Sequence, residues 1–156
     1  MKIQWKTLIG CLALPLGVGV LSALFSSEGM QVFESLQKPP LSPPGWLFPV
    51  AWTILYLMMG LASYFMTTSD APQSEKDSAW KVYGIQLGFN FFWSILFFNF
   101  RLYFISFFWL LALWALILTT LIFFYQIEKK AGYLMIPYLA WVSFAGYLNL
   151  AIAILN

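Results

Sequence analysis

Five long apolar stretches without charged residues divide the chain. They run over residues 7–27, 45–66, 82–100, 102–127 and 131–156. A helix needs about 20 mainly apolar residues to cross a bilayer, so each stretch can hold one span. Inside hydrocarbon every backbone amide must bond within its own segment, which makes the spans helical. The pattern predicts an all-α membrane protein, a five-transmembrane-helix bundle forming one domain over residues 1–156, with spans at about 7–26, 45–66, 82–100, 103–125 and 133–155.

The first stretch has an alternative interpretation. Lys2 and Lys6 precede an apolar run, as at the start of a secretory signal. The run of about 20 residues is longer than a usual signal core and contains Pro15. We therefore expect a retained helix, with a cleaved signal as the alternative.

The distribution of basic residues predicts the orientation. Cytoplasmic loops are enriched in Lys and Arg. The amino end and the loops after the second and fourth spans hold six of the eight basic residues, whereas the other two loops hold Lys38 and Arg101. We therefore expect the amino end to be cytoplasmic and the carboxyl end to be outside. The longest connections, Ser27–Pro44 and Thr67–Ala79, are predicted to be loops.

Composition excludes several classes of function. Residues are 62% hydrophobic and 9% charged, whereas a soluble domain has about 25% charged residues. A net charge of +2 is too small for a nucleic-acid footprint. With no histidine and a single cysteine, the chain lacks the means for a catalytic triad or a metal cluster. We expect no metal, no cofactor and no conventional enzyme.

Three predicted spans each carry a one-sided stripe of aromatic and polar residues. Spacings of three and four residues place each stripe on one helix face. Amides are costly in a membrane, so they indicate either contacts between helices or a polar handle inside a cavity. Aromatic walls suit a flat, apolar ligand. The candidate ligand-binding residues are Phe48, Trp52, Tyr56, Gln86, Asn90, Trp93, Tyr138, Trp141, Ala145 and Leu148.

The third predicted span also carries a face of small residues. Gly84 and Gly88 are four residues apart, the spacing of close helix contacts in membranes. Gly84 and Gln86 are separated by about 200° around the helix, so the small face lies opposite the polar face. The spacing indicates a helix–helix contact, and a homodimer through this span is one interpretation.

The motifs considered together resemble a known family. They are Ser35–Pro39, Pro43-Pro44 before the second span, Trp52 with Leu55-Tyr56, the set Gln86, Asn90, Trp93 and Arg101, and the segment 137–145. In this combination the chain resembles the tryptophan-rich sensory protein family, whose mitochondrial relatives are called translocator protein or peripheral-type benzodiazepine receptor. The resemblance covers nearly the whole chain.

The resemblance implies a five-helix bundle that dimerises through Gly84 and Gly88. It implies a cavity beneath the first loop that binds porphyrins, such as protoporphyrin IX, and benzodiazepine- or isoquinoline-type ligands. Asn90 and Ala145 match ligand-contact positions of the family. The expected function is that of a membrane receptor or carrier with a sensory or transport role, and we expect porphyrin, membrane lipid and a second copy of the chain as partners.

Two further functions stay open. Some members of the family degrade porphyrin in light and oxygen with two tryptophans, and by motif those would be Trp52 and Trp141. A non-catalytic assembly subunit would bind no small ligand saturably. Lys38 and Arg101, near the expected cavity mouth, are candidates to pair with the propionates of a porphyrin.

The chain departs from the family at two functional positions. Leu41 stands where a tryptophan is usual before Pro-Pro. The ligand contact that this tryptophan would make from the first loop is therefore in doubt. No tyrosine followed by a basic residue comes after Asn149, so the family's cholesterol motif is absent. The short tail favours a bacterial plasma membrane as the location.

Overall fold

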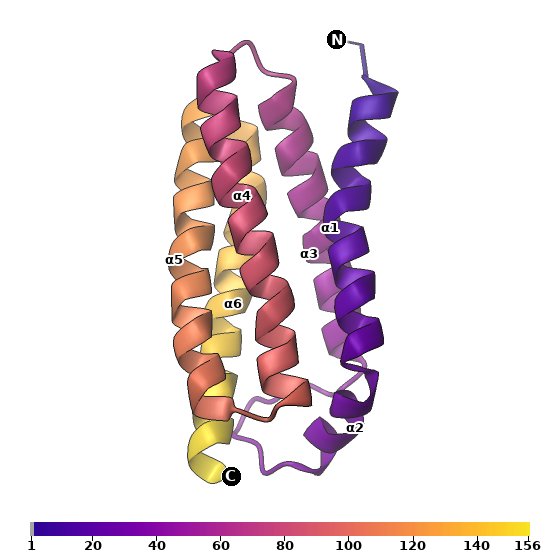
Figure 1. Cartoon of the computed structure of the whole chain (residues 1–156), viewed down its shortest axis with the longest axis vertical. Helices are drawn as coiled ribbons and strands as arrows, with labels where there is room; N and C mark the ends of the chain where they lie inside the picture. Colours follow the sequence, from indigo (N-terminus) through magenta and orange to yellow (C-terminus); the bar gives the residue numbers. More distant parts are fainter. Residues whose placement is uncertain (1) are drawn as a thin grey trace.

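The computed structural model describes residues 2–156 and is helical almost throughout (Figure 1). No strand occurs in this range, so the all-α prediction is confirmed. The elements in chain order are α1 (Trp5–Phe25), α2 (Ser27–Ser35), α3 (Leu47–Thr67), α4 (Gln73–Ser94), the π-helical turn η1 (Ile95–Asn99), α5 (Tyr103–Ile127) and α6 (Lys129–Leu155).

The five long helices run along a common axis and form a closed ring of neighbours (Figure 1). The most extensive contacts join α5 to α6, α1 to α3, α4 to α5 and α3 to α6, and α1 closes the ring against α4. The short helix α2 lies across the end of the bundle where the carboxyl terminus also lies. The five long helices therefore surround a common interior, with a cover at one end.

Four helices, α1, α3, α5 and α6, are long and apolar enough to cross a membrane. The helix α4 begins at Gln73, nine residues before the expected span at 82, and carries Glu75, Lys76 and Asp77 in its first turns. The apolar stretch 82–100 occupies the rest of α4 together with η1. The described residues thus establish four candidate spans, and the fifth stays a prediction.

Both long loops were predicted with bounds that are wrong. Within Ser27–Pro44 the chain forms α2, and within Thr67–Ala79 the helix α4 begins at Gln73. Pro72 occupies the N-cap position with φ −58°, and Glu75 lies in the first turn, where a negative charge favours the helix dipole. These start signals lie among polar residues, which is why the pattern of apolar stretches did not include them.

Two glycines allow helices to approach closely. A Cβ atom at Gly60 would lie 2.8 Å from Leu12 Cα, where α3 crosses α1. A Cβ atom at Gly132 would lie 2.8 Å from Tyr125 Cα, where α6 follows α5. Since membrane helices gain stability mainly from close packing, these contacts hold the helix pairs in a fixed register.

Candidate functional site

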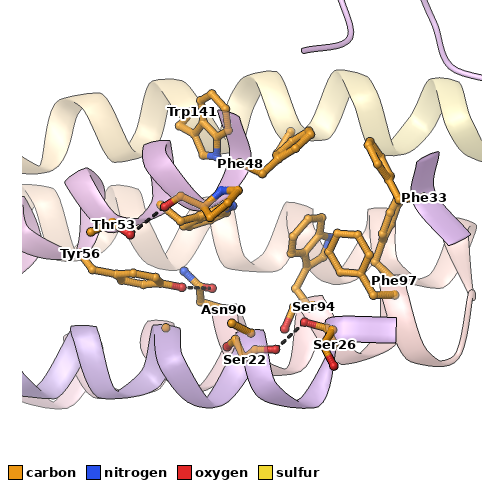
Figure 2. Close-up of a pocket in the computed structure, with 18 of the residues that line it drawn as sticks. Ser22, Ser26, Phe33, Phe48, Thr53, Tyr56, Asn90, Ser94, Phe97 and Trp141 are labelled. Carbon is orange, nitrogen blue, oxygen red and sulfur yellow. Dashed lines mark hydrogen bonds between the residues drawn. The ribbon is translucent and has the colours of Figure 1, made fainter. Parts of the chain in front are cut away.

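A cavity of about 400 Å³ lies between α1, α3, α4 and α6, beneath α2. Its lining is mostly aromatic and aliphatic, with a few hydroxyl and amide groups (Figure 2). The structure brings eight of the ten candidate ligand-binding residues into this lining: Phe48, Trp52, Tyr56, Asn90, Trp93, Trp141, Ala145 and Leu148.

Trp52 stands at the centre of the aromatic wall. Its ring stacks on Tyr56 at 5.6 Å between centroids and meets Trp141 nearly at right angles, at 6.4 Å and 86°. Phe48 extends the wall, with its ring 6.0 Å from that of Trp141. The Trp141 Nε1–H is buried and has no hydrogen-bond partner within residues 2–156. This donor is therefore free to bond to a ligand.

Below the cavity, a chain of hydrogen bonds links α3, α4 and α6. The Tyr56 hydroxyl donates to Asn90 Oδ1 at 3.2 Å, and Asn90 Nδ2 donates to the Tyr138 hydroxyl at 2.7 Å. The Tyr138 hydroxyl donates in turn to Gln86 Oε1 at 2.7 Å. Gln86 and Tyr138, which were predicted to bind a ligand, are fully buried and do not line the cavity. They fix the orientation of Asn90, which does.

A second polar tie holds the wall formed by α4 and α6. Trp93 Nε1 donates to Asn149 Oδ1 at 3.0 Å, and Asn149 Nδ2 donates to the Tyr103 carbonyl at 2.7 Å. The Trp93 ring stacks on Phe97 of η1 at 5.5 Å. Both polar ends of Asn149 are engaged by neighbouring helices, so this residue positions the cavity wall. Trp93 therefore contributes its ring rather than its N–H to the cavity lining.

The cover of the cavity consists of α2 and residues 36–46. Phe33 of α2 is only 4% exposed and packs against Phe48 at 5.2 Å between ring centroids. The carboxyl-terminal residue Asn156 fastens the following segment, because its side chain accepts a bond from the Gln37 amide and donates one to the Gln37 carbonyl. The Tyr147 hydroxyl donates to the Pro40 carbonyl at 2.8 Å. The cover is thus bonded to α6.

Among the lining residues that sequence reasoning missed are three phenylalanines, Phe33, Phe97 and Phe98, and the serines at the junction of α1 and α2. Phe97 and Phe98 belong to η1, and π-helical turns are often found at functional sites. A Cβ atom at Gly29 would lie 2.9 Å from the Phe98 carbonyl oxygen, so α2 rests directly on η1. The apolar positions Gly29 and Phe33, four residues apart, are the only local signal for this contact.

Lys38 and Arg101 do not line the cavity. Lys38 Nζ donates to the Glu34 carbonyl at 3.1 Å and lies 5.2 Å from the centre of the Phe33 ring. Arg101 is exposed between η1 and α5, with a φ of 54°. Leu41 is 83% exposed, also outside the lining, with a φ of 71°. The pairing of these cations with the propionates of a porphyrin stays a prediction.

Gly84 and Gly88 lie on an open face of α4. No atom of the described chain outside the local helix lies within 4 Å of a Cβ built at either position. Packing within one chain therefore does not require glycine there. Gln86, on the opposite face, is fully buried, in agreement with the expected division of this helix into a small face and an inward face.

The fold and the cavity together define the class of protein. It is a helical membrane protein with an internal cavity lined by aromatic side chains. Within residues 2–156 no three His, Cys, Asp or Glu side chains gather as a metal site requires. The groups that line the cavity are ring faces, aliphatic side chains, hydroxyls and amides, with the free indole N–H of Trp141.

Comparison with known proteins identifies the family. Residues 11–155 match the TspO/MBR family. The chain is 37% identical over 157 residues to the tryptophan-rich protein TspO of Chlorobaculum tepidum, covering 100% of this chain and 99% of the relative. It is 35% identical to the translocator protein of Bos taurus, covering 96% and 89%, and 30% identical to the tryptophan-rich sensory protein of Cereibacter sphaeroides, covering 100% and 95%. The chain belongs to the TspO/MBR family of membrane proteins, which confirms the resemblance.

Proposed function

We propose that this protein is a membrane receptor or carrier that binds porphyrin-like tetrapyrroles, such as protoporphyrin IX, in the cavity between α1, α3, α4 and α6. The observation that supports this most is the wall of Trp52, Trp141 and Phe48 facing an open space of about 400 Å³. Sites for small molecules have volumes of about 300–1,000 Å³ and few polar groups. Ligands of the benzodiazepine and isoquinoline type share the flat aromatic character that this wall suits.

The binding chemistry follows from the lining. Ring faces bury a flat apolar ligand, and edge-to-face contacts with indoles add orientation. Ala145 is the small residue of its stripe, so it leaves room for the ligand beside Trp141 and Leu148. The free Trp141 N–H and the Asn90 amide supply directional contacts. Binding of this kind fits a sensory or transport role.

The test is a titration with protoporphyrin IX in the dark, followed by quenching of tryptophan fluorescence. Trp52→Phe, Trp141→Phe and Asn90→Ala should each raise Kd about tenfold, the equivalent of about 1.4 kcal/mol. Trp114→Phe is the matched control, because Trp114 lies outside the cavity and its Nε1 donates to Ser143 at 2.8 Å. Unchanged binding in all three cavity variants would contradict the proposal.

A second candidate function is porphyrin degradation driven by light, with molecular oxygen as the oxidant. The edge-to-face arrangement of Trp52 and Trp141, 6.4 Å apart, places two oxidisable rings against the same ligand space. Under illumination in air, the double variant Trp52→Phe, Trp141→Phe should lose porphyrin more slowly than wild type at equal occupancy. Equal rates would exclude this function and leave binding intact.

We also propose the membrane arrangement expected from the sequence, in a bacterial plasma membrane. The end of the bundle with the amino terminus carries six of the basic residues, and the covered end carries Lys38 and Arg101. This bias favours a cytoplasmic amino end, with α4 and η1 as the fifth span. Labelling of single cysteines placed at residues 4 and 41 from one side of sealed vesicles tests this orientation.

A homodimer through α4 is part of the same proposal. The open positions Gly84 and Gly88 leave a shallow face for a second copy. Gly84→Leu should lower the dimer fraction in mild detergent and leave the monomer folded.

A chain that only assembles with other subunits would show no thermal shift with porphyrin, because only a ligand that binds the folded state raises its stability.

A further inference from the structure

The corner of the cavity where α1 passes into α2 gathers its serine hydroxyls, whereas Thr53 and Tyr56 carry two more hydroxyls on α3. Ser22, Ser26 and Ser27 line the cavity from this corner, and Ser94 lines it from α4 (Figure 2). Phe48 and Trp141 lie on the far wall in the same view. The cavity therefore has an aromatic wall and, across from it, a corner with serine hydroxyls.

The amino terminus of α2 opens at this corner without a cap. The first N–H groups of a helix have no acceptor inside the helix and attract negative charge. Ser26 is the N-cap residue, yet it makes no side-chain cap bond. Its hydroxyl donates to the Ser22 carbonyl instead. Within the described chain no earlier backbone carbonyl accepts a bond from the first amides of this nine-residue helix either, and Ser27, its first residue, lines the cavity, so these amides are available to a ligand.

Ser22 gives a second, independent indication of a ligand. Its side chain lines the cavity, the residue is 8% exposed, and its Oγ has no hydrogen-bond partner within the described chain. A buried hydroxyl without a partner costs stability, and a ligand oxygen would satisfy it.

The hydroxyls of the other serines that line this part of the cavity already donate hydrogen bonds to backbone carbonyls. Ser27 Oγ donates to the Leu24 carbonyl at 3.4 Å, and Ser94 Oγ donates to the Phe91 carbonyl at 2.8 Å. The donors left for a ligand are the Ser22 hydroxyl and the first amides of α2. Free hydroxyl and amide donors at a helix amino terminus are the arrangement that binds an oxyanion. Glu28, the acidic residue of this first turn, is exposed.

We propose that this corner binds a carboxylate of the ligand that occupies the cavity. The inference rests on the proposed function: the flat ring packs against Trp52 and Trp141, and one carboxylate accepts bonds from Ser22 Oγ and the first amides of α2. The corner lies at the end of α1, on the covered end of the bundle (Figure 1). A charge near the end of a span is less costly than one at the centre of the bilayer.

The test compares protoporphyrin IX with its dimethyl ester, which keeps the ring and removes both negative charges. Wild type should bind the acid about tenfold more tightly than the ester. Ser22→Ala should abolish most of this preference, because it weakens binding of the acid much more than binding of the uncharged ester. Ser143→Ala is the matched control, because Ser143 lies outside the cavity and its Oγ donates to the Leu139 carbonyl at 2.9 Å.

A second variant tests the helix terminus by changing charge. Ser26→Asp supplies the missing N-cap, so the Tm should rise or hold, while the new carboxylate competes for the same amides. Affinity for the acid should fall about tenfold or more, and that for the ester should not. Glu28→Gln should strengthen binding of the acid, because it removes a negative charge from the same turn.

The outcomes separate the two claims. Equal affinity of wild type for acid and ester, or equal weakening of both by Ser22→Ala, would overturn the carboxylate site and leave porphyrin binding standing. Failure of wild type to bind either compound would overturn the proposed function itself.

Discussion

Tyr138 and Tyr83 are fully buried tyrosines that differ in what their hydroxyls contact. The Tyr138 hydroxyl accepts a bond from Asn90 and donates one to Gln86, both at 2.7 Å. The Tyr83 hydroxyl forms no hydrogen bond of normal geometry within residues 2–156, although the Ser63 side chain lies close to it. Replacing each tyrosine by phenylalanine is therefore the same chemical change at two positions with opposite hydrogen bonding.

The magnitude follows from the bonds lost. Tyr138→Phe removes two buried hydrogen bonds and leaves Gln86 with neither amide atom partnered. Bonds between side chains in membrane bundles average about 0.6 kcal/mol, and net hydrogen bonds in proteins about 1 kcal/mol. The free energy of unfolding should fall by about 1–2 kcal/mol. Tyr83→Phe removes a hydroxyl whose burial is uncompensated, so stability should stay the same or rise by up to about 1 kcal/mol.

The assay is reversible unfolding in mixed micelles by titration with sodium dodecyl sulfate, followed by far-ultraviolet circular dichroism. Equal helix content of the three proteins before titration is the control for correct folding. A loss for Tyr83→Phe as large as that for Tyr138→Phe would refute the reasoning, because it would show that the ring environment rather than the hydrogen-bond chain sets the cost.

Further predictions concern glycine contacts, strain and the cover. Gly60→Ala should lower the Tm, since the new Cβ would lie 2.8 Å from the backbone of α1. The free energy of unfolding should fall by about 1–3 kcal/mol. Gly84→Ala should leave the Tm unchanged, because there is open space around this position. Leu41→Gly should raise the free energy of thermal unfolding by up to about 1 kcal/mol, because a φ of 71° strains leucine; a fall would contradict this. Asn156→Ala removes both bonds to Gln37 and should speed porphyrin dissociation about tenfold in stopped-flow measurements, whereas an unchanged rate would show that the cover does not gate exchange.

Much of the site was predictable because helix geometry is regular. Spacings of three and four residues placed Phe48, Trp52 and Tyr56 on one face of α3, and the structure brings this face to the cavity. The stripe on α6 from Trp141 to Leu148 reaches the same cavity. Once five long helices pack around a common interior, inward stripes have few other places to meet.

The spacing did not predict which residues of a stripe lie level with the cavity along the helix axis. Gln86 and Asn90 share a stripe on α4, but the cavity ends at Asn90, so Gln86 lies one turn deeper in the core. Tyr138 is below the cavity for the same reason on α6. A stripe gives the direction of a side chain around the helix axis, and only packing determines where along that axis space remains.

The cover was not predictable either, because local pattern contributes little to it. The nine residues of α2 are too few to form a stable isolated helix, so its structure depends on burying Phe33 against the bundle. The π-helical turn η1 has no marked sequence signal, yet it places Phe97 and Phe98 in the cavity lining. Contacts distant in sequence, such as that between Gln37 and Asn156, complete the cover.

The most direct test of the central claim is an experimental structure of the protein with protoporphyrin IX bound in lipid. The account predicts density for a tetrapyrrole between Trp52, Trp141 and Ala145, with one propionate at the corner formed by Ser22 and α2. A second hollow of about 320 Å³ lies on the outer face between α5 and α6, lined by Phe107, Trp114 and Tyr147 among others. Density for the tetrapyrrole in that groove, with the cavity between α1, α3, α4 and α6 empty at saturating ligand, would contradict the account.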